Sequence, residues 1–172
     1  KSLLKKFKIS GPFALATIHR AENTDCENRL KAITSGLNSV HQELPVLCPI
    51  HPRTIKELNR INLSPQFFVG EPIGYLEMLY LEKNASVIIT DSGGVQKEAF
   101  FQQTPCITCR TETEWVELIE HGWNQLANPN DPKSIPTCVQ EVMSQTKPAY
   151  IDDLYGDGNA AELIIKKIIS FK

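Results

Sequence analysis

Short runs of apolar residues alternate along this chain with longer segments in which apolar residues recur every three or four positions. The apolar runs predict strands at Pro12 to Ile18, Val46 to Ile50, Gln66 to Val69, Val87 to Ile89, Cys106 to Cys109 and Trp123 to Ala127. The periodic segments predict helices at residues 24–43, 54–61, 75–83, 95–101, 115–121 and 131–143, and a terminal helix over about 159–171. This alternation predicts an α/β fold with a doubly wound, Rossmann-like parallel sheet in a single domain over residues 1–172.

Capping signals and apolar faces refine the predicted helices. Thr24 to Glu27 and Thr111 to Glu114 have the spacing of capping boxes, and Ser2 to Phe7 is predicted as the end of a helix. The predicted inward face of helix 75–83 consists of Leu76, Leu79 and Tyr80.

The terminal helix carries a strong apolar stripe. It is formed by Ala161, Ile164, Ile165, Ile168 and Phe171. The stripe either packs on its own domain or is exposed, and an exposed stripe favours self-association.

The stretch from Ser86 to Glu98 is the centre of the sequence. Asp91 and Ser92 end an apolar run, and Gly93-Gly94 lets the backbone turn sharply into a helix. A helix that opens at the carboxyl edge of a parallel sheet presents free N–H groups and a positive dipole end, which suit a phosphate. The same residues equally suit an ordinary turn between a strand and a helix, with Ser92 as the N-cap.

Composition excludes several classes of function. The formal net charge is −2 and the hydrophobic content is 41%, and no basic run or aromatic platform predicts nucleic-acid binding. No apolar stretch approaches the roughly 20 residues of a membrane span. The five cysteines form no disulfide pattern, and Cys106 and Cys109 would point to opposite faces of a strand. They predict reduced thiols in a cytoplasmic protein and no zinc site.

Charged side chains gather where the predicted strands end. His19 and Arg20 follow the first strand, His51 and Arg53 follow the second, and Arg110 follows the fifth. Because the carboxyl ends of parallel strands share one edge of a sheet, this rim predicts an anionic ligand. Phosphate would be recognised by Arg and His side chains together with backbone N–H groups.

Glu98 lies one turn into the helix that follows the glycines. A carboxylate at that position can accept hydrogen bonds from both hydroxyls of a ribose, and the alternative is a solvated helix glutamate. The sequence has no G-x-G-x-x-G or G-K-[ST] loop and no cluster of metal ligands. NAD, P-loop ATP and metal chemistry therefore lack their usual sequence signatures.

Six motifs follow one another along nearly the whole chain. They are Thr17 to Asn23 (T-I-H-R-A-E-N), His51 to Arg53 (H-P-R), Asp91 to Ala99 (D-S-G-G-V-Q-K-E-A), Arg110 to Glu117 (R-T-E-T-E-W-V-E), Gly122 to Asn124 (G-W-N) and Gly156 to Ala161 (G-D-G-N-A-A). Together they resemble the non-hydrolysing UDP-N-acetylglucosamine 2-epimerases, and they match the carboxyl-terminal half of such an enzyme. The resemblance implies two Rossmann-like domains facing across a cleft, the glycosyltransferase-B arrangement, with the amino-terminal domain absent here.

The resemblance also implies roles for residues of the rim. Ser92 to Gly94 would bind the diphosphate, Glu98 would hold the ribose, and Ile73 and Tyr75 would border the uracil. His19 matches an active-site histidine and is the catalytic candidate. The other implied substrate contacts are Arg20, His51, Arg110, Thr113 and Glu114, of which the last three would line the sugar end.

The family reaction inverts C2 of the sugar. UDP is eliminated to leave a glycal, and it is added back after the other face is protonated. The resemblance implies neither a metal nor another cofactor, and the carboxylates that move the C2 proton would belong to the absent half. It further implies a homodimer that supplies precursors of bacterial surface polysaccharide, whereas this chain alone is expected to be inactive.

Two other interpretations stay open: a domain of a glycosyltransferase-B-type UDP-sugar glycosyltransferase, or a non-catalytic nucleotide-binding module. The sequence also departs from the family pattern. Lys97 stands where many relatives have an acidic residue. Arg110 to Trp115 is more similar to relatives that act on 2,3-diacetamido uronic acid sugars than to the plain N-acetylglucosamine enzymes. The exact sugar therefore stays open.

Overall fold

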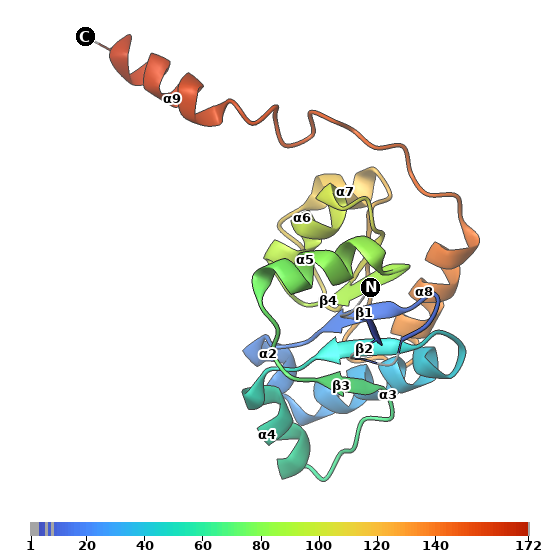
Figure 1. Cartoon of the computed structure of the whole chain (residues 1–172). Coiled ribbons are helices and arrows are strands. Elements are labelled where there is room, and N and C mark those ends of the chain that lie inside the picture. Colours follow the sequence, from blue (N-terminus) through green and yellow to red (C-terminus); the bar gives the residue numbers. More distant parts are fainter. Residues whose placement is uncertain (1–3, 6, 8, 172) are drawn as a thin grey trace.

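The computed structural model describes residues 4, 5, 7 and 9–171, so half of the helix predicted over Ser2 to Phe7 (residues 2, 3 and 6) lies outside the described residues. A sheet of six parallel strands, in the order β3-β2-β1-β4-β5-β6, forms the centre of the protein (Figure 1). The strands are β1 (Ala14–Thr17), β2 (Val46–Pro49), β3 (Phe68–Gly70), β4 (Val87–Thr90), β5 (Cys106–Thr108) and β6 (Asn124–Leu126). The order reverses between β1 and β4, which confirms the predicted doubly wound, Rossmann-like α/β fold.

Helices cover both faces of this sheet. They are α2 (Ala21–Thr24), α3 (Glu27–Glu43), α4 (Pro52–Arg60), α5 (Tyr75–Asn84), α6 (Gly93–Phe101), α7 (Val116–Glu120), α8 (Ser134–Ser144) and α9 (Ala160–Ile169). One core cluster packs α3, α4 and α8 on one face, and a second packs α5 and α6 on the other. The layers follow from right-handed crossovers, which place helices on both sides of a parallel sheet.

Side chains of the central strands alternate between these two cores. Along β1, Ala14 and Ala16 join the core beneath α3, whereas Leu15 joins the core beneath α5 and α6. Cys106 and Cys109 likewise belong to opposite cores, as the sequence predicts. All five cysteines are free thiols.

Neither predicted capping box begins its helix. Thr24 ends α2, and its hydroxyl donates to the carbonyl oxygen of Arg20 at 3.1 Å, so α3 begins at Glu27 without a side-chain cap. Thr111 lies outside α7, whose N-cap is Trp115. The first prediction is wrong because the chain forms the extra turn α2 before α3, and the second because Thr111 lies in the loop after β5, before α7 starts.

The inward face of α5 is shifted from the predicted one. Leu76 is 79% exposed, whereas Leu81 and Glu82 are fully buried. Leu79 and Tyr80 are half-buried. The prediction is wrong for Leu76 because α5 approaches the sheet only in its last two turns.

The terminal helix α9 stands away from the sheet at the end of an extended segment (Figure 1). None of its residues is buried, and the isoleucines and the phenylalanine of its stripe are 57–79% exposed. Of the two alternatives, the stripe is therefore exposed in this chain. In the part of the chain that the structure describes, no helix combines the length and the apolar character that crossing a membrane requires.

Candidate functional site

The parallel sheet brings the loops that follow its strands to one edge. Because β1 and β4 flank the reversal of strand order, the loops after them border the crevice in which open α/β sheets bind ligands. All the predicted site residues lie on this edge or in the first turns after it. They are His19 and Arg20 after β1, His51 after β2, Ile73 and Tyr75 after β3, Ser92 to Gly94 and Glu98 after β4, and Arg110, Thr113 and Glu114 after β5.

Asp91 joins the loops after β1 and β4. It is fully buried, and its carboxylate accepts hydrogen bonds from the backbone N–H of His19 at 3.1 Å, from that of Arg20 at 3.0 Å and from Asn23 Nδ2 at 3.1 Å. The His19 Nδ1 atom lies 3.4 Å from Asp91 Oδ1. A carboxylate beside Nδ1 favours a proton on that nitrogen, which leaves Nε2 of a neutral ring as an acceptor.

Helix α6 begins at Gly93, directly after its N-cap Ser92. The Ser92 Oγ atom accepts from the N–H of Val95 at 3.5 Å, and the Ser92 N–H donates to Thr90 Oγ1 at 2.9 Å. Among the described residues, no protein acceptor pairs with the N–H of Gly93 or Gly94. Gly94 is exposed and Gly93 is half-buried. The N-cap and the phosphate interpretations therefore describe the same turn, since the capped helix still presents open amides and its positive dipole end.

Gln96 holds the start of α6 from within the protein. Its buried side chain donates from Nε2 to the Ser92 carbonyl oxygen at 3.2 Å. Its Oε1 atom accepts from Thr113 Oγ1 at 2.6 Å and from Asn124 Nδ2 at 2.9 Å. Asn124 in turn accepts from the Thr108 hydroxyl at 2.8 Å. The Thr113 hydroxyl is therefore engaged inside the protein, and the network ties α6 to β5, to β6 and to the loop between β5 and α7.

Trp115 holds the first carbonyl group of α6 from the other side. Its Nε1–H donates to the carbonyl oxygen of Gly93 at 2.8 Å. The ammonium of Lys97 lies 4.5 Å from the Trp115 ring centroid and 4.1 Å from that of Tyr155. The departure from the family pattern at Lys97 thus places a cation–π contact beside the site.

Carboxylates accompany both arginines of the predicted site. Arg20 Nη1 lies 3.3 Å from Glu22 Oε1, and Arg110 Nη1 lies 2.6 Å from Glu114 Oε2. Glu22 Oε1 also lies 3.7 Å from Arg110 Nε. The cations predicted from sequence are thus largely paired, and the open amides of α6 are the main unpaired positive feature of this edge.

The Glu114 carboxylate lies over Gly93, in the space that a Cβ atom there would need. A hydrogen bond from its own backbone N–H, and then the Arg110 guanidinium, lower the pKa of the Glu114 carboxyl. Glu114 is therefore ionised at neutral pH, and its close approach explains why position 93 holds a glycine.

A cavity of about 230 Å³ opens between the loops that follow β1, β2 and β3. It brings His19, His51 and Ile73 together, and Pro72 and Met78 add apolar surface. The His51 Nδ1 atom accepts from a backbone N–H two residues on and caps α4. A mainly apolar cavity with two imidazoles at its edge suits a flat ring with a few polar atoms.

Tyr75 and Glu98 lie on the two helices α5 and α6. Tyr75 begins α5 and is 64% exposed, so its ring is open to a ligand. Glu98 lies in α6, one turn beyond the glycines, and is half-buried. The side chain of Glu98 is thus less exposed to solvent than the alternative interpretation, a fully solvated helix glutamate, would require.

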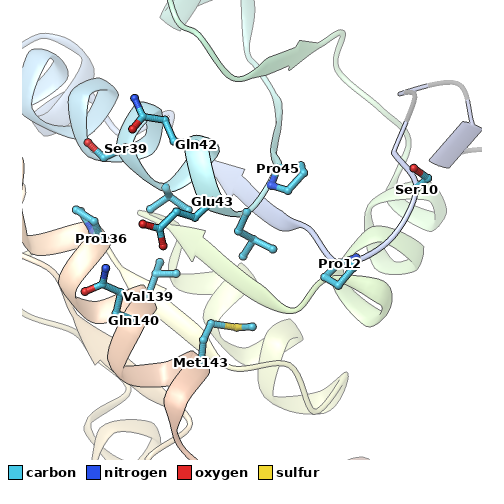
Figure 2. Close-up of a pocket in the computed structure, with 12 residues that line it drawn as sticks. Ser10, Pro12, Ser39, Gln42, Glu43, Pro45, Pro136, Val139, Gln140 and Met143 are labelled. Carbon is cyan, nitrogen blue, oxygen red and sulfur yellow. The ribbon is translucent and has the colours of Figure 1, made fainter.

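A larger cavity, of about 650 Å³, lies at the opposite edge of the sheet, between the end of α3 and the length of α8 (Figure 2). Pro12 and Pro45, which line it, precede β1 and β2. This cavity is therefore remote from the predicted site residues. Within the part of the chain that the structure describes, no group of three or more His, Cys, Asp and Glu residues is placed to hold a metal ion.

The residues that support this edge from inside were not predicted as site residues. Asp91, Asn23 and Gln96 are fully buried polar residues, although each belongs to one of the six motifs. One signal was available, because a polar residue directly after a wholly apolar strand has backbone N–H groups of neighbouring loops as its nearest partners. The partners of Gln96 could not be found this way, since two of them, Thr113 and Asn124, come from distant segments.

Proteins of known name match this chain over most of its length. The family described as UDP-N-acetylglucosamine 2-epimerase matches residues 1–169. UDP-2,3-diacetamido-2,3-dideoxy-D-glucuronate 2-epimerase from Pseudomonas aeruginosa is 43% identical over 155 residues, which cover 88% of this chain and 43% of that protein. UDP-N-acetylglucosamine 2-epimerase from Methanocaldococcus jannaschii is 40% identical over 166 residues, which cover 92% of this chain and 44% of that protein.

The fold agrees with these sequence matches. The crystal structure of Methanocaldococcus jannaschii UDP-GlcNAc 2-epimerase in complex with UDP-GlcNAc and UDP has a TM-score of 0.85 and 35% identity, and covers 100% of this chain and 49% of that one. The chain thus spans about half the length of the relatives it matches. Since the family match extends over nearly every residue, the chain belongs to the UDP-N-acetylglucosamine 2-epimerase family.

Proposed function

We propose that this chain is the UDP-binding half of a UDP-sugar 2-epimerase, and that residues 1–172 form one domain of a larger enzyme. The observation that carries the proposal is the start of α6, where the N–H groups of Gly93 and Gly94 are open at the sheet edge. Backbone amides at a helix N-terminus are a general anion site, and a diphosphate fits two adjacent donors. The family match and the similarity to an epimerase solved with UDP support the same ligand.

The surrounding residues suit the other parts of the nucleotide. Glu98 lies one turn further into α6 and would accept hydrogen bonds from the ribose hydroxyls. The uracil would lie against Ile73 and Tyr75, at the apolar cavity between the loops. Diphosphate, ribose and base would then follow one line from the start of α6 to the start of α5.

The proposed reaction depends on the binding of the diphosphate by the backbone amides at the start of α6. A base in the other half of the enzyme removes the C2 proton, the bond between C1 and the UDP oxygen breaks, and a glycal remains. UDP then returns to C1 after C2 is protonated on its other face, so the sugar is inverted at C2. The amides of Gly93 and Gly94 would stabilise the negative charge that UDP gains as it leaves.

The sugar end of the site would be formed by His19 and the loop after β5. His19 is half exposed and is oriented by Asp91, so we assign it as the active-site histidine of this half. Arg110 and Glu114 form an ion pair next to Gly93, from which they can reach the sugar bound to the diphosphate. The residues from Arg110 to Trp115 support a 2,3-diacetamido uronic acid sugar as substrate, whereas overall identity does not separate the diacetamido-glucuronate enzyme (43%) from the UDP-N-acetylglucosamine enzyme (40%).

The wider setting follows from the same proposal. The remaining half of the cleft would be an amino-terminal domain, because the relatives are about twice as long as this chain. We further propose that the whole enzyme is a cytoplasmic homodimer that makes polysaccharide precursors. The exposed stripe of α9 is then a surface that another domain or chain covers.

Binding of UDP tests the site directly. A Cβ atom at Gly94 would meet nothing nearer than Ser92 Oγ at 3.9 Å, so Gly94→Val is expected to fold normally. Its methyl groups would nevertheless block the open amides. We expect titration calorimetry to show UDP affinity falling by about 100-fold, because two charge-assisted hydrogen bonds of roughly 1.5 kcal/mol each are lost.

Ser92→Trp should have the same effect, whereas Ser35→Trp on the exposed face of α3 should not. The Ser35 variant controls for the size and the non-specific hydrophobic interactions of an added indole. If the unaltered chain, Gly94→Val and Ser92→Trp all bind UDP with equal affinity, UDP does not bind at the start of α6.

The isolated chain should bind UDP weakly and should not epimerise. Only one wall of the cleft is present, so the sugar is not positioned between acid and base and the effective concentration of the reacting groups is lost. We expect NMR to show no C2 epimer formed either from UDP-2,3-diacetamido-2,3-dideoxy-D-glucuronate or from UDP-N-acetylglucosamine. Turnover above the rate without protein would show that this half carries the chemistry by itself.

A further inference from the structure

The segment between α8 and α9, which we call the arm (residues 145–159), is a feature that the proposed function does not use. It contains neither helix nor strand, and it passes α6 and α7 on its way to α9 (Figure 1). Three of its side chains, Tyr150, Leu154 and Tyr155, pack against a buried cluster that includes Phe100 of α6. The rings of Tyr150 and Phe100 are stacked, with centroids 4.9 Å apart. The arm is therefore docked on the same helix whose start forms the proposed diphosphate site.

Tyr155 brings the arm into contact with Trp115, the N-cap residue of α7. The two rings meet edge to face, with centroids 5.9 Å apart and planes at 87°. The ammonium of Lys97 lies 4.1 Å from the Tyr155 centroid and 4.5 Å from the Trp115 centroid, so it bridges the two rings. Edge-to-face and cation–π contacts both depend on how the rings are oriented. The docked arm thus restricts the orientation of the Trp115 ring.

The indole N–H of Trp115 reaches the turn at the start of α6, where it donates to the carbonyl oxygen of Gly93 at 2.8 Å. This carbonyl and the N–H of Gly94 belong to one peptide unit. Because that unit is planar and trans, the direction of its carbonyl fixes the direction of its N–H. A hydrogen bond to the carbonyl also polarises the unit and makes its N–H a stronger donor. Trp115 therefore orients one of the two amides that would bind the diphosphate.

We propose that Trp115 is a positioning residue that couples the docked arm to the nucleotide site, by holding the N–H of Gly94 towards the diphosphate. The identity of the ligand rests on the proposed function. When the arm leaves, the Trp115 ring is free to rotate, its hydrogen bond to Gly93 is lost, and the Gly94 amide loses its fixed direction. Coupling between two sites is reciprocal, so UDP holds the arm in place by the same factor by which the docked arm strengthens UDP binding.

Titration calorimetry with UDP tests the positioning step. Trp115→Phe keeps a ring for Tyr155 and removes the indole N–H, so we expect UDP affinity to fall by about fivefold, as for the loss of one hydrogen bond. Tyr155→Ala should lower it by about threefold, because the indole is loosened and not removed. Affinity for uridine, which lacks the diphosphate, should not change in either variant. This comparison excludes a general loss of structure at the base and ribose.

Tyr155→Phe is the conservative variant. The ring of Tyr155 makes the contacts with Trp115 and Lys97, whereas its buried hydroxyl has no hydrogen-bond partner of normal geometry among the described residues. We therefore expect Tyr155→Phe to bind UDP as the unaltered chain does. A loss equal to that of Tyr155→Ala would contradict coupling through the ring.

Hydrogen exchange in the arm tests the reciprocal effect. The N–H of Gly156 donates to the carbonyl oxygen of Asp153 at 2.9 Å, so its exchange rate reports opening of the arm. Saturating UDP should slow this exchange by about threefold in the unaltered chain, the same factor by which Tyr155→Ala weakens UDP binding. In Trp115→Phe, saturating UDP should leave the exchange rate unchanged, because the connecting hydrogen bond is absent.

A measurement without ligand separates this inference from the proposed function. The ¹³C resonance of the Gly93 carbonyl reports its hydrogen bond to the indole, so Trp115→Phe should shift it and Tyr155→Ala should shift it in the same direction. A chain that does not bind UDP contradicts the proposed function, and this resonance then still decides whether the arm orients the turn. The coupling is overturned if the resonance does not respond to Tyr155→Ala. It is also overturned if UDP binds and Trp115→Phe keeps full affinity, or if that variant weakens uridine as much as UDP.

Discussion

Asp91→Asn should destabilise the protein by about 3 kcal/mol, because buried hydrogen bonds to a charged acceptor contribute roughly 1.5–3 kcal/mol each. The Asp91 carboxylate accepts from two backbone N–H groups and from Asn23 Nδ2. An amide in its place turns an NH₂ group towards these donors and leaves at least one of them unpaired. The loss can be measured as the free energy of unfolding in urea, monitored by circular dichroism.

The same change should also loosen the loop that carries His19. In the amide variant the backbone N–H groups of His19 and Arg20 lose their charged acceptor, so backbone amide exchange at both residues should accelerate together. Asp152→Asn is the matched control, because Asp152 is exposed and no partner is found for its side chain among the described residues. If Asp91→Asn and Asp152→Asn unfold at the same urea concentration, the buried carboxylate does not join β4 to the loop after β1.

The sheet was predictable because most of its strands are short, mainly apolar runs, and the central ones are buried on both faces, whereas β6 (Asn124–Leu126) is largely polar. A strand that is apolar on both faces must be buried on both faces, as it is in the interior of a parallel sheet covered by helices. The edge that holds the site was predictable for a related reason, since parallel strands place all their carboxyl ends together. Ser92, Gly93 and His19 could therefore be assigned to one edge from the order of strands and helices alone.

Predictions that depended on a single local pattern were less reliable. The spacing of Thr24 and Glu27 fits a capping box, yet the Thr24 hydroxyl bonds to Arg20 because the chain forms the extra turn α2 first. Leu76 fits a helical apolar face, yet it lies where α5 extends beyond the core. The spacing of residues along the chain limits which contacts can form. Which of them do form depends on the path of the neighbouring loops.

Charge pairing could not be predicted from the sequence for the same reason. The rim predicted an excess of Arg and His, but Arg110 contacts both Glu22, from another loop, and Glu114, from its own. Only the fold shows that these acids lie between the cations. What then attracts an anion is the start of α6, whose amides were predicted to be open from the glycine pair alone.

Gln96→Leu should destabilise the protein by about 2–3 kcal/mol and weaken UDP binding by about tenfold, because three hydrogen bonds are lost and a buried amide is left unpaired. Gln96 joins the Ser92 carbonyl to Thr113 and Asn124, so its loss frees the start of α6 to tilt. Urea unfolding gives the first quantity and titration calorimetry with UDP the second. Gln140→Leu, at an exposed position on α8, controls for the loss of an amide at the surface.

A double-mutant cycle distinguishes this network from a general loss of packing. Asn124→Leu removes the partner that donates to Gln96 Oε1, and each single change then leaves the other amide buried without that bond. The double variant removes both groups, so the two losses should be less than additive by about 1–2 kcal/mol, as expected for residues in direct contact. Strictly additive losses would mean that Gln96 and Asn124 act separately. The start of α6 would then be held by Ser92 and Trp115 alone. In that case the changes at Gln96 and Asn124 should leave UDP affinity unaltered.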